Sequence, residues 1–235
     1  MQPNIVEQKA YYDARWDSEV GVNSLQIERC AAILAELWRL GLKAPRILDL
    51  GCGNGWLTSI LSHFGDAVGV DLSAASATRR YPHLTFYEAD LTRWHPSIER
   101  FDLITSQEVI EHIGEQKDFI NVAADLLNPG GYLILTTPNA RITAACSEEW
   151  RKAWLRQPVE NVITARSLRS LLATRFTVLR LTSITTGVGE TLFYRAINSP
   201  KLCAVLRNFG LLPIYESAIR EMKFGLHLLA VARKR

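Results

Sequence analysis

Cysteine is scarce in this sequence, and long apolar runs are absent. The four cysteines stand far apart along 235 residues, and no two of them form a Cys-x-x-Cys pair. This spacing excludes disulfide-stapled small domains and zinc fingers, and it favours reduced thiols in a cytoplasmic protein. No run approaches the roughly 18 apolar residues of a transmembrane helix. The first residues also lack the basic and apolar regions of a signal peptide, so we expect no membrane-spanning segment.

Acidic residues are few in the second part of the chain. The formal net charge of the whole sequence is +3, but the charge is −7 over residues 1–140 and +10 over residues 141–235. This asymmetry is either ordinary solvated charge or a basic wall that faces an anionic substrate or surface. No run such as Lys-Lys-Arg-Lys marks a nucleic-acid patch, so a nucleic-acid partner is not expected.

Apolar runs that are too short for helices alternate with amphipathic segments along the chain. The apolar runs predict strands near 46–50, 67–70, 84–87, 101–105, 132–137, 176–184 and 226–232. The amphipathic segments predict helices near 25–40, 55–64, 73–80, 115–127 and 164–173. Strands separated by helices indicate a doubly wound α/β fold with a mostly parallel sheet. Such sheets bind ligands beyond the carboxyl ends of their strands.

A glycine-rich turn follows the first predicted strand and precedes a predicted helix. Gly51, Gly53 and Gly55 allow a sharp turn and a close approach of the backbone to a ligand, which the following helix amides would face. A dinucleotide fingerprint would place a further glycine at position 56, where this sequence has Trp56. An indole there would occupy the space of a diphosphate, so we expect a nucleotide-like ligand without one.

Acidic residues follow the second and third predicted strands. Asp71 stands twenty positions after Gly51, where a carboxylate accepts hydrogen bonds from ribose hydroxyls. Its competing role is that of a helix N-cap. Asp90 is placed to accept from an adenine amine, with Leu91 against the adenine face, and its competing role is turn formation.

These motifs together resemble those of class I S-adenosylmethionine-dependent methyltransferases. The resemblance rests on ILDLGCGNG, VGVD, EAD, FDLITS and LLNPGGYLILTTPN, closely over about 45–140 and more loosely over the final strands. It implies a Rossmann-like sheet of seven strands with an antiparallel last strand, and S-adenosylmethionine across the strand ends. It also implies that Gln107, Asp49, Cys52 and Leu72 contact the cofactor, which would leave as S-adenosylhomocysteine.

The resemblance extends to the N-terminus, where YYDARW (11–16) is similar to an aromatic cap over the cofactor. Tyr12 and Trp16 would either close over the cofactor or simply pack on the core. We expect a single domain (1–235) with a helical cap (1–44), a cofactor-binding core (45–140) and a substrate-side half (141–235). A glycine-flanked insertion at about 187–225, with two amphipathic stretches, is expected to be a lid or an oligomer contact.

The candidate chemical site follows the fourth predicted strand. Glu108, Glu111 and His112 would share one face of a helix, where they could hold a divalent cation such as Mg²⁺ and lower the pKa of a hydroxyl. The alternative is a helix start with His112 as a plain base or a packed side chain. The string EVIEH resembles the metal motif of ubiquinone-biosynthesis O-methyltransferases and of enzymes that methylate the terminal ribose of small RNAs. The further histidine of the RNA enzymes is missing from residues 156–164, where Glu160 could substitute.

We therefore expect a methyltransferase that uses S-adenosylmethionine and acts on a small molecule at a hydroxyl oxygen. The alternatives are an RNA terminal ribose 2′-O-methyltransferase and a non-catalytic binding or scaffold protein with the same fold. The insertion would cap the acceptor pocket, and its basic residues would favour an anionic or sugar-containing acceptor (Arg195, Lys201, Arg207, Arg220 and Lys223). Asn139 would either orient this acceptor or stabilise a turn. A homodimer remains open.

Overall fold

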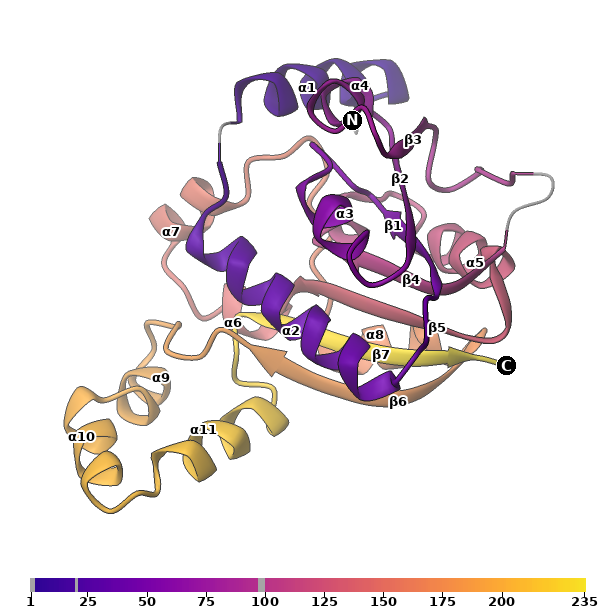
Figure 1. Cartoon of the computed structure of the whole chain (residues 1–235). Coiled ribbons are helices and arrows are strands. Elements are labelled where there is room, and N and C mark those ends of the chain that lie inside the picture. The colour runs from indigo at the N-terminus through magenta and orange to yellow at the C-terminus, as the bar shows by residue number, and fades with distance from the viewer. Residues whose placement is uncertain (1–2, 20, 97–99) are drawn as a thin grey trace.

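A seven-stranded sheet forms the centre of the computed structural model, which describes residues 3–19, 21–96 and 100–235 (Figure 1). The strands are β1 (Arg46–Leu50), β2 (Asp66–Asp71), β3 (Thr85–Glu88), β4 (Phe101–Gln107), β5 (Leu127–Pro138), β6 (Phe176–Ile184) and β7 (His227–Lys234). Their order in the sheet is β3-β2-β1-β4-β5-β7-β6. Strand β7 is antiparallel to both of its neighbours, and the other pairings are parallel. The predicted sheet is confirmed, including its antiparallel last strand.

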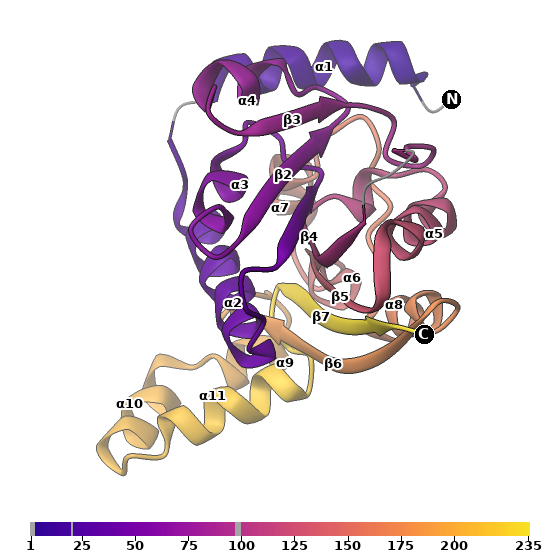
Figure 2. The same cartoon turned by 45° about the vertical axis from the view of Figure 1, so that its right-hand side comes forward.

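Helices cover both faces of this sheet (Figures 1 and 2). They are α1 (Ile5–Ser18), α2 (Ser24–Leu40), α3 (Trp56–Leu61), α4 (Ala75–Arg80), α5 (Gln116–Leu126), α6 (Ala140–Thr143), α7 (Glu148–Trp154), α8 (Ala165–Leu172), α9 (Leu192–Ile197), α10 (Pro200–Asn208) and α11 (Leu212–Glu221), with a 3₁₀ helix at Ile110–His112. No helix among the described residues is both long and apolar enough to cross a membrane.

Two apolar layers hold the helices to the sheet. On one face, Phe119 and Leu168 from α5 and α8 are buried with residues of β4 and β6. On the other face, Ile33 and Leu37 of α2 are buried with residues of α3 and the central strands. Helix α2 has defined ends, because an Asn23 capping box closes its start and a left-handed Gly41 ends it. This packing fixes the carboxyl ends of the parallel strands at one edge of the sheet.

The insertion at 187–225 forms three short helices, α9 to α11, where the sequence predicted two amphipathic stretches. Both views show α10 and α11 as a hairpin that projects from the body of the domain (Figures 1 and 2). A small apolar cluster attaches the insertion to α6, and its buried members are Ile142, Tyr194 and Leu226. The insertion is therefore anchored beside α6 and α7.

Asn139, at the end of β5, has a structural position rather than a substrate-facing one. Its side chain is buried, its Nδ2 donates to the carbonyls of Lys223 and Gly225 at 3.0 Å each, and its Oδ1 accepts from the Arg141 amide. We expect Asn139→Ala to lower the free energy of unfolding by about 2–4 kcal/mol, because the buried carbonyl of Gly225 and the partly buried carbonyl of Lys223 lose their donor. Urea denaturation measures this loss. The matched control Asn23→Ala removes an exposed helix cap and should cost only about 1 kcal/mol, so equal losses would contradict this role.

Candidate active site

The carboxyl ends of β1, β2 and β4 meet at one cavity of about 280 Å³, here called the main pocket. Its volume lies near the lower end of the range for small-molecule sites. Thirteen of the fifteen candidate site residues line it: Tyr12, Trp16, Asp49, Gly51, Cys52, Gly53, Asp71, Leu72, Asp90, Leu91, Gln107, Glu108 and His112. The two that do not are Gly55 and Glu111. Residues separated by up to 100 positions are thus brought together.

The glycine turn after β1 adopts a backbone that other residues would strain. Gly51 and Gly53 have φ angles of +89° and +54°. A Cβ on Gly51 would lie 2.3 Å from Cγ2 of Val109, and one on Gly53 would lie 3.0 Å from the Trp16 ring. Gly55 also has a positive φ, but it serves packing, because a Cβ there would meet Phe86 at 2.9 Å. The turn therefore presents bare backbone to the main pocket.

Asp71 ends β2 and closes this turn. Its Oδ2 accepts from the Gly53 amide at 2.9 Å, and its Oδ1 accepts from the Ser73 amide at 3.0 Å. Burial raises the pKa of Asp71 to about 6, against the stabilising effect of these amides on the charged form. Each carboxylate oxygen retains a second lone pair, and the side chain lines the main pocket. The residue can thus accept two further hydrogen bonds from a ligand.

Asp90, Leu91 and Asp49, which were also predicted to contact the cofactor, line the same pocket but differ in hydrogen bonding and burial. Asp90 uses Oδ1 to accept from the amide and hydroxyl of Thr92, at 2.9 and 2.7 Å, and so forms the predicted turn as well. The adjacent Leu91 is buried and apolar. Asp49 lies deeper, where its Oδ2 accepts from Thr58 Oγ1 at 2.7 Å, and burial raises its pKa to about 7.

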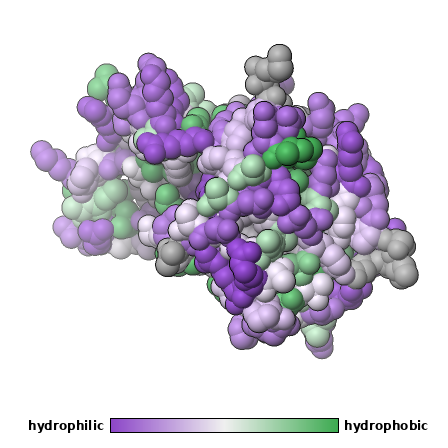
Figure 3. All heavy atoms as spheres, turned by 90° about the horizontal axis from the view of Figure 1, so that it is seen from above, coloured by the Kyte–Doolittle hydropathy of each residue, from purple (hydrophilic) through white to green (hydrophobic). Residues whose placement is uncertain are grey.

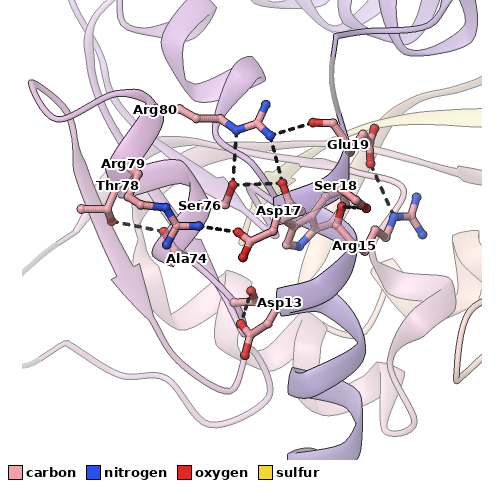
Figure 4. Close-up of polar contacts among 12 residues, drawn as sticks. Asp13, Arg15, Asp17, Ser18, Glu19, Ala74, Ser76, Thr78, Arg79 and Arg80 are labelled. Atoms are coloured by element: carbon pink, nitrogen blue, oxygen red, sulfur yellow. Dashed lines mark hydrogen bonds and ion pairs between the residues drawn. The ribbon is translucent and has the colours of Figure 1, made fainter.

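Helix α1 brings Tyr12 and Trp16 to the main pocket, with their rings stacked at a centroid distance of 6.1 Å. None of the α1 side chains is buried, and polar contacts attach the helix to α4 (Figure 4). Arg80 donates to the carbonyls of Trp16 and Glu19, and Arg79 pairs with Asp17. The aromatic pair therefore lies over the glycine turn on a helix that is held mainly by surface ion pairs and hydrogen bonds.

Glu108 directly follows β4 and carries backbone strain. Its φ is +57°, a left-handed conformation that non-glycine residues adopt uncommonly. Its Oε2 lies 3.3 Å from His227 Nε2 and 3.8 Å from Arg29 Nη1. Its Oε1 is buried without a partner, as are Arg29 Nε and Gln107 Oε1. Unpartnered buried polar atoms on three pocket-lining residues are suited to a polar ligand.

His112 lies at the same end of the main pocket. Its Nδ1 is 2.9 Å from the Val159 carbonyl, so Nδ1 carries the proton and donates there. Its Nε2 is 2.6 Å from the Gln157 side-chain nitrogen, from which it accepts. Burial lowers the pKa of His112 to about 4. The imidazole is therefore neutral at pH 7, and its basic nitrogen faces a pocket-lining amide.

The described residues do not gather the predicted metal ligands into one group. Residues Ile110–His112 are a 3₁₀ helix, so Glu108, Glu111 and His112 do not share an α-helical face. Glu111 does not line the main pocket: its Oε2 accepts from Thr137 Oγ1 at 2.9 Å, its Oε1 lies 3.6 Å from His112 Nε2, and burial raises its pKa well above the usual range. Glu160 Oε2 lies 3.8 Å from His112 Nδ1, but that nitrogen already donates to a carbonyl. The described residues contain no group of three acidic, histidine or cysteine side chains that could hold a metal ion.

Several pocket residues were not predicted from the sequence. Arg15, Gln26 and Arg29 come from α1 and α2, and Gln157 comes from the segment between α7 and α8. Such positions carry no motif, because an amphipathic helix has the same pattern whether its polar residues face water or a ligand. The insertion, by contrast, contributes no described residue to the main pocket, so it does not cap the pocket as we expected. Its anchorage beside α6 explains this.

Comparisons with known proteins agree with this geometry. A family model described as a methyltransferase domain matches residues 22–178. The ubiquinone biosynthesis O-methyltransferase of Alkalilimnicola ehrlichii is 30% identical over 127 residues, 50% of this chain and 49% of the relative. The protein of the same name from Coxiella burnetii is 32% identical over 114 residues, 45% of this chain and 49% of the relative. The chain thus spans about half the length of the curated relatives that it matches.

Solved structures share the fold at low sequence identity. The N-methyltransferase NodS from Bradyrhizobium japonicum WM9, in complex with S-adenosyl-L-homocysteine, has a TM-score of 0.60 at 18% identity and covers 98% of this chain and 96% of its own. The [4+2]-cyclase SpnF has a TM-score of 0.61 at 18% identity, and the match covers 92% of this chain and 84% of the cyclase chain. Since a cyclase shares it, the fold alone does not fix the chemistry. Because the family model covers more than half of the sequence, this chain belongs to the methyltransferase-domain family, with the class I fold.

Proposed function

We propose that this protein transfers a methyl group from S-adenosylmethionine to a hydroxyl oxygen of a small molecule. One observation carries the proposal. A glycine turn and the ribose-type acid Asp71 share the main pocket with a neutral histidine and a strained glutamate, His112 and Glu108. The glycine turn and Asp71 suit an adenosyl ligand. His112 and Glu108 lie where an acceptor would meet that ligand. The names of the curated relatives support the transfer to oxygen.

The charge of the main pocket favours a sulfonium over a diphosphate. Its acidic side chains outnumber its guanidinium groups by five to two: Asp49, Asp71, Asp90, Glu108 and Glu115 against Arg15 and Arg29. Asp49, whose pKa burial raises to about 7, is only partly ionised at pH 7, and the other four acids still exceed the two arginines. A cationic sulfonium is stabilised by such a field, whereas a diphosphate would be repelled. Trp56 also lines the pocket, at the position where a dinucleotide-binding turn needs glycine. The residues present therefore fit S-adenosylmethionine.

Each cofactor group has a matching residue in the main pocket. Asp71 would accept from the ribose hydroxyls with its two remaining lone pairs. Asp90 would accept from the adenine amine through Oδ2, and Leu91 would contact the adenine ring. The bare backbone at Gly51 and Gly53 would accommodate the methionine portion, with Tyr12 and Trp16 above it.

His112 would act as the general base on the acceptor. When bound, S-adenosylmethionine supplies an electrophilic methyl carbon and a thioether leaving group. The Val159 carbonyl holds the proton on Nδ1, which leaves the lone pair of Nε2 for the proton of the acceptor hydroxyl. The hydroxyl would replace the Gln157 amide at Nε2, and its oxygen would form the new bond to carbon as its proton moves to His112.

Glu108 would orient the acceptor beside this base. Its unpartnered Oε1 needs a hydrogen-bond donor, and a second hydroxyl or an amine of the acceptor would supply one. Arg29 Nη1 lies 3.8 Å from the other carboxylate oxygen and donates to His227 Nε2 at 3.0 Å. The divalent cation is not part of this proposal, because Glu111 accepts from Thr137 and does not line the main pocket, and the described residues gather no three side chains that could hold an ion.

The proposed role of Asp71 predicts a pH dependence of cofactor affinity. Because burial raises its pKa to about 6, the carboxylate is ionised at pH 8 and becomes protonated as the pH falls through 6. The affinity for S-adenosylhomocysteine should be constant above about pH 7 and fall by up to about tenfold per pH unit below 6. Calorimetry between pH 5 and 8 measures this. Asp71→Asn should remove the fall below pH 6, and an unchanged profile would contradict the assignment. Asp49, whose pKa is raised to about 7, is present in both proteins and therefore does not cause a difference between them.

An activity assay tests the proposed function directly. Methyl-labelled S-adenosylmethionine is incubated with the protein and a panel of mono- and dihydroxy aromatic compounds, hydroxycarboxylates and primary amines. We expect transfer to hydroxyl compounds, and loss of transfer in Asp71→Ala. Cofactor binding without transfer to any panel member or cell extract would favour a non-catalytic protein. Transfer to amines alone would place the reaction at nitrogen.

A further inference from the structure

We propose that α9, α10 and α11 (192–221), here together called the hairpin, form a docking surface for an anionic phospholipid bilayer. The protein lies on this bilayer without spanning it. The proposal goes beyond methyl transfer and does not depend on it, because the hairpin contributes no described residue to the main pocket. Three observations carry it: an exposed apolar stripe, a local absence of acidic residues and a set of cations that form no ion pairs.

The apolar stripe begins on α10. Leu202, Val205 and Phe209 have the spacing i, i+3 and i+7, which places them on one face of a helix. All three are exposed, Phe209 by 75%, and none of the α10 side chains is buried. Leu211 and Ile214 extend the apolar surface around the tip, and Ile214 is 68% exposed. An amphipathic helix whose apolar face has no partner in its own chain marks an interaction surface.

The rest of the hairpin leaves this stripe uncovered. Helix α10 packs against α11, and α11, in which Ile219 is buried, packs against β6. Leu192 and Phe193 of α9 add further exposed apolar surface, with exposures of 86% and 50%. Figure 3 shows green, apolar atoms beside purple, hydrophilic ones on the projecting lobe at the left. The apolar residues therefore gather on the part of the molecule that stands farthest from the sheet.

Charge identifies the partner as an anionic surface. Residues 191–215 contain no Asp or Glu, but they contain Arg195, Lys201 and Arg207. All three cations are exposed, and none of them takes part in an ion pair among the residues that the structure describes. The nearby acids Glu216 and Glu221 are instead paired with Arg220 and Arg180. Exposed Leu and Phe beside Lys and Arg are the pattern of helices that lie in the interface of an anionic membrane.

Sedimentation with vesicles tests this docking. The full chain is mixed with vesicles of phosphatidylcholine alone or of phosphatidylcholine with phosphatidylglycerol, and we expect binding only to the second. Val205→Asp and Phe209→Asp should each weaken the binding at least tenfold, because they place a charge at the acyl boundary. Lys201→Gln should weaken it about fivefold, and added salt should weaken it further. Trp38→Asp is the matched control, since Trp38 is 80% exposed on α2, outside the hairpin, and should bind like the parent.

Each alternative outcome decides against the proposal. No binding of the parent to anionic vesicles, or equal binding to both vesicle types, would overturn it. Binding that Val205→Asp, Phe209→Asp and Lys201→Gln leave unchanged would place the contact elsewhere. A dimer in size-exclusion chromatography that Phe209→Asp converts to a monomer, with no vesicle binding by the parent, would assign the stripe to a second copy of the chain. Methyl transfer to a water-soluble acceptor should persist in all these variants, so failure here is distinct from failure of the proposed activity.

Discussion

Replacing Asp71 with alanine is expected to weaken S-adenosylhomocysteine binding by at least about 100-fold and to leave the fold intact. The size follows from the two hydrogen bonds that its carboxylate would accept from ribose hydroxyls, since bonds to a charged group contribute about 1.5–3 kcal/mol each, and about 1.4 kcal/mol is a tenfold change in affinity. The carboxylate also orders the glycine turn through Gly53 and Ser73, and this loss adds to the effect. Titration calorimetry at pH 8, where Asp71 is ionised, measures the change.

Two variants separate the ribose contact from the ordering of the turn. Asp71→Asn keeps an acceptor for one of the two amides but loses the charge, so we expect an intermediate affinity. Asp90→Ala is the matched control, because Asp90 also lines the main pocket but its side chain is 34% exposed. Water competes for that contact, and we expect a loss of about tenfold or less. An equal loss for both positions, or no loss for Asp71→Ala, would show that Asp71 does not hold the ribose.

The sequence predicted features that depend on local pattern. Short apolar runs gave the strands, because a strand buried on both faces needs continuous apolar residues. The place of Asp71 followed from the parallel sheet, whose strands end at one edge, so an acid at the end of β2 must lie near the turn after β1. The same argument applies to Asp90, which follows β3, whereas Gln107 was implied by the resemblance to class I methyltransferases; both line the main pocket.

The chemical end of the site could not be predicted in the same way. The helical face proposed for Glu108, Glu111 and His112 assumed α-helical spacing, but Glu108 is left-handed and the next turn is a 3₁₀ helix. These conformations depend on distant partners, such as Arg29, which is 79 positions before Glu108, and Val159, which is 47 positions after His112. No local pattern encodes such contacts. The insertion was likewise predicted as a unit, but the sequence did not predict that it packs beside α6 rather than over the main pocket.

His112→Ala should lower kcat by about 10²–10⁴, the usual contribution of a general base, and change cofactor affinity less than threefold. Glu111→Gln is the matched control from the same motif: Glu111 is 1% exposed, burial raises its pKa, and glutamine keeps an acceptor for Thr137. We expect its kcat to remain within about threefold of the parent. A metal held by both residues would instead make both substitutions severe.

The pH profile and a chelator complete this test, because a base and a metal ligand respond differently. With the pKa of His112 lowered to about 4, its neutral form is present at pH 5 and above, so kcat at saturating cofactor should stay level between pH 7 and pH 5. A base with an ordinary histidine pKa would lose activity near pH 6.5. Treatment with a chelator should leave kcat unchanged, since the described residues gather no three side chains that could hold an ion. Loss of activity on chelation, with recovery on adding Mg²⁺, would show that the motif rearranges around a cation when the acceptor binds.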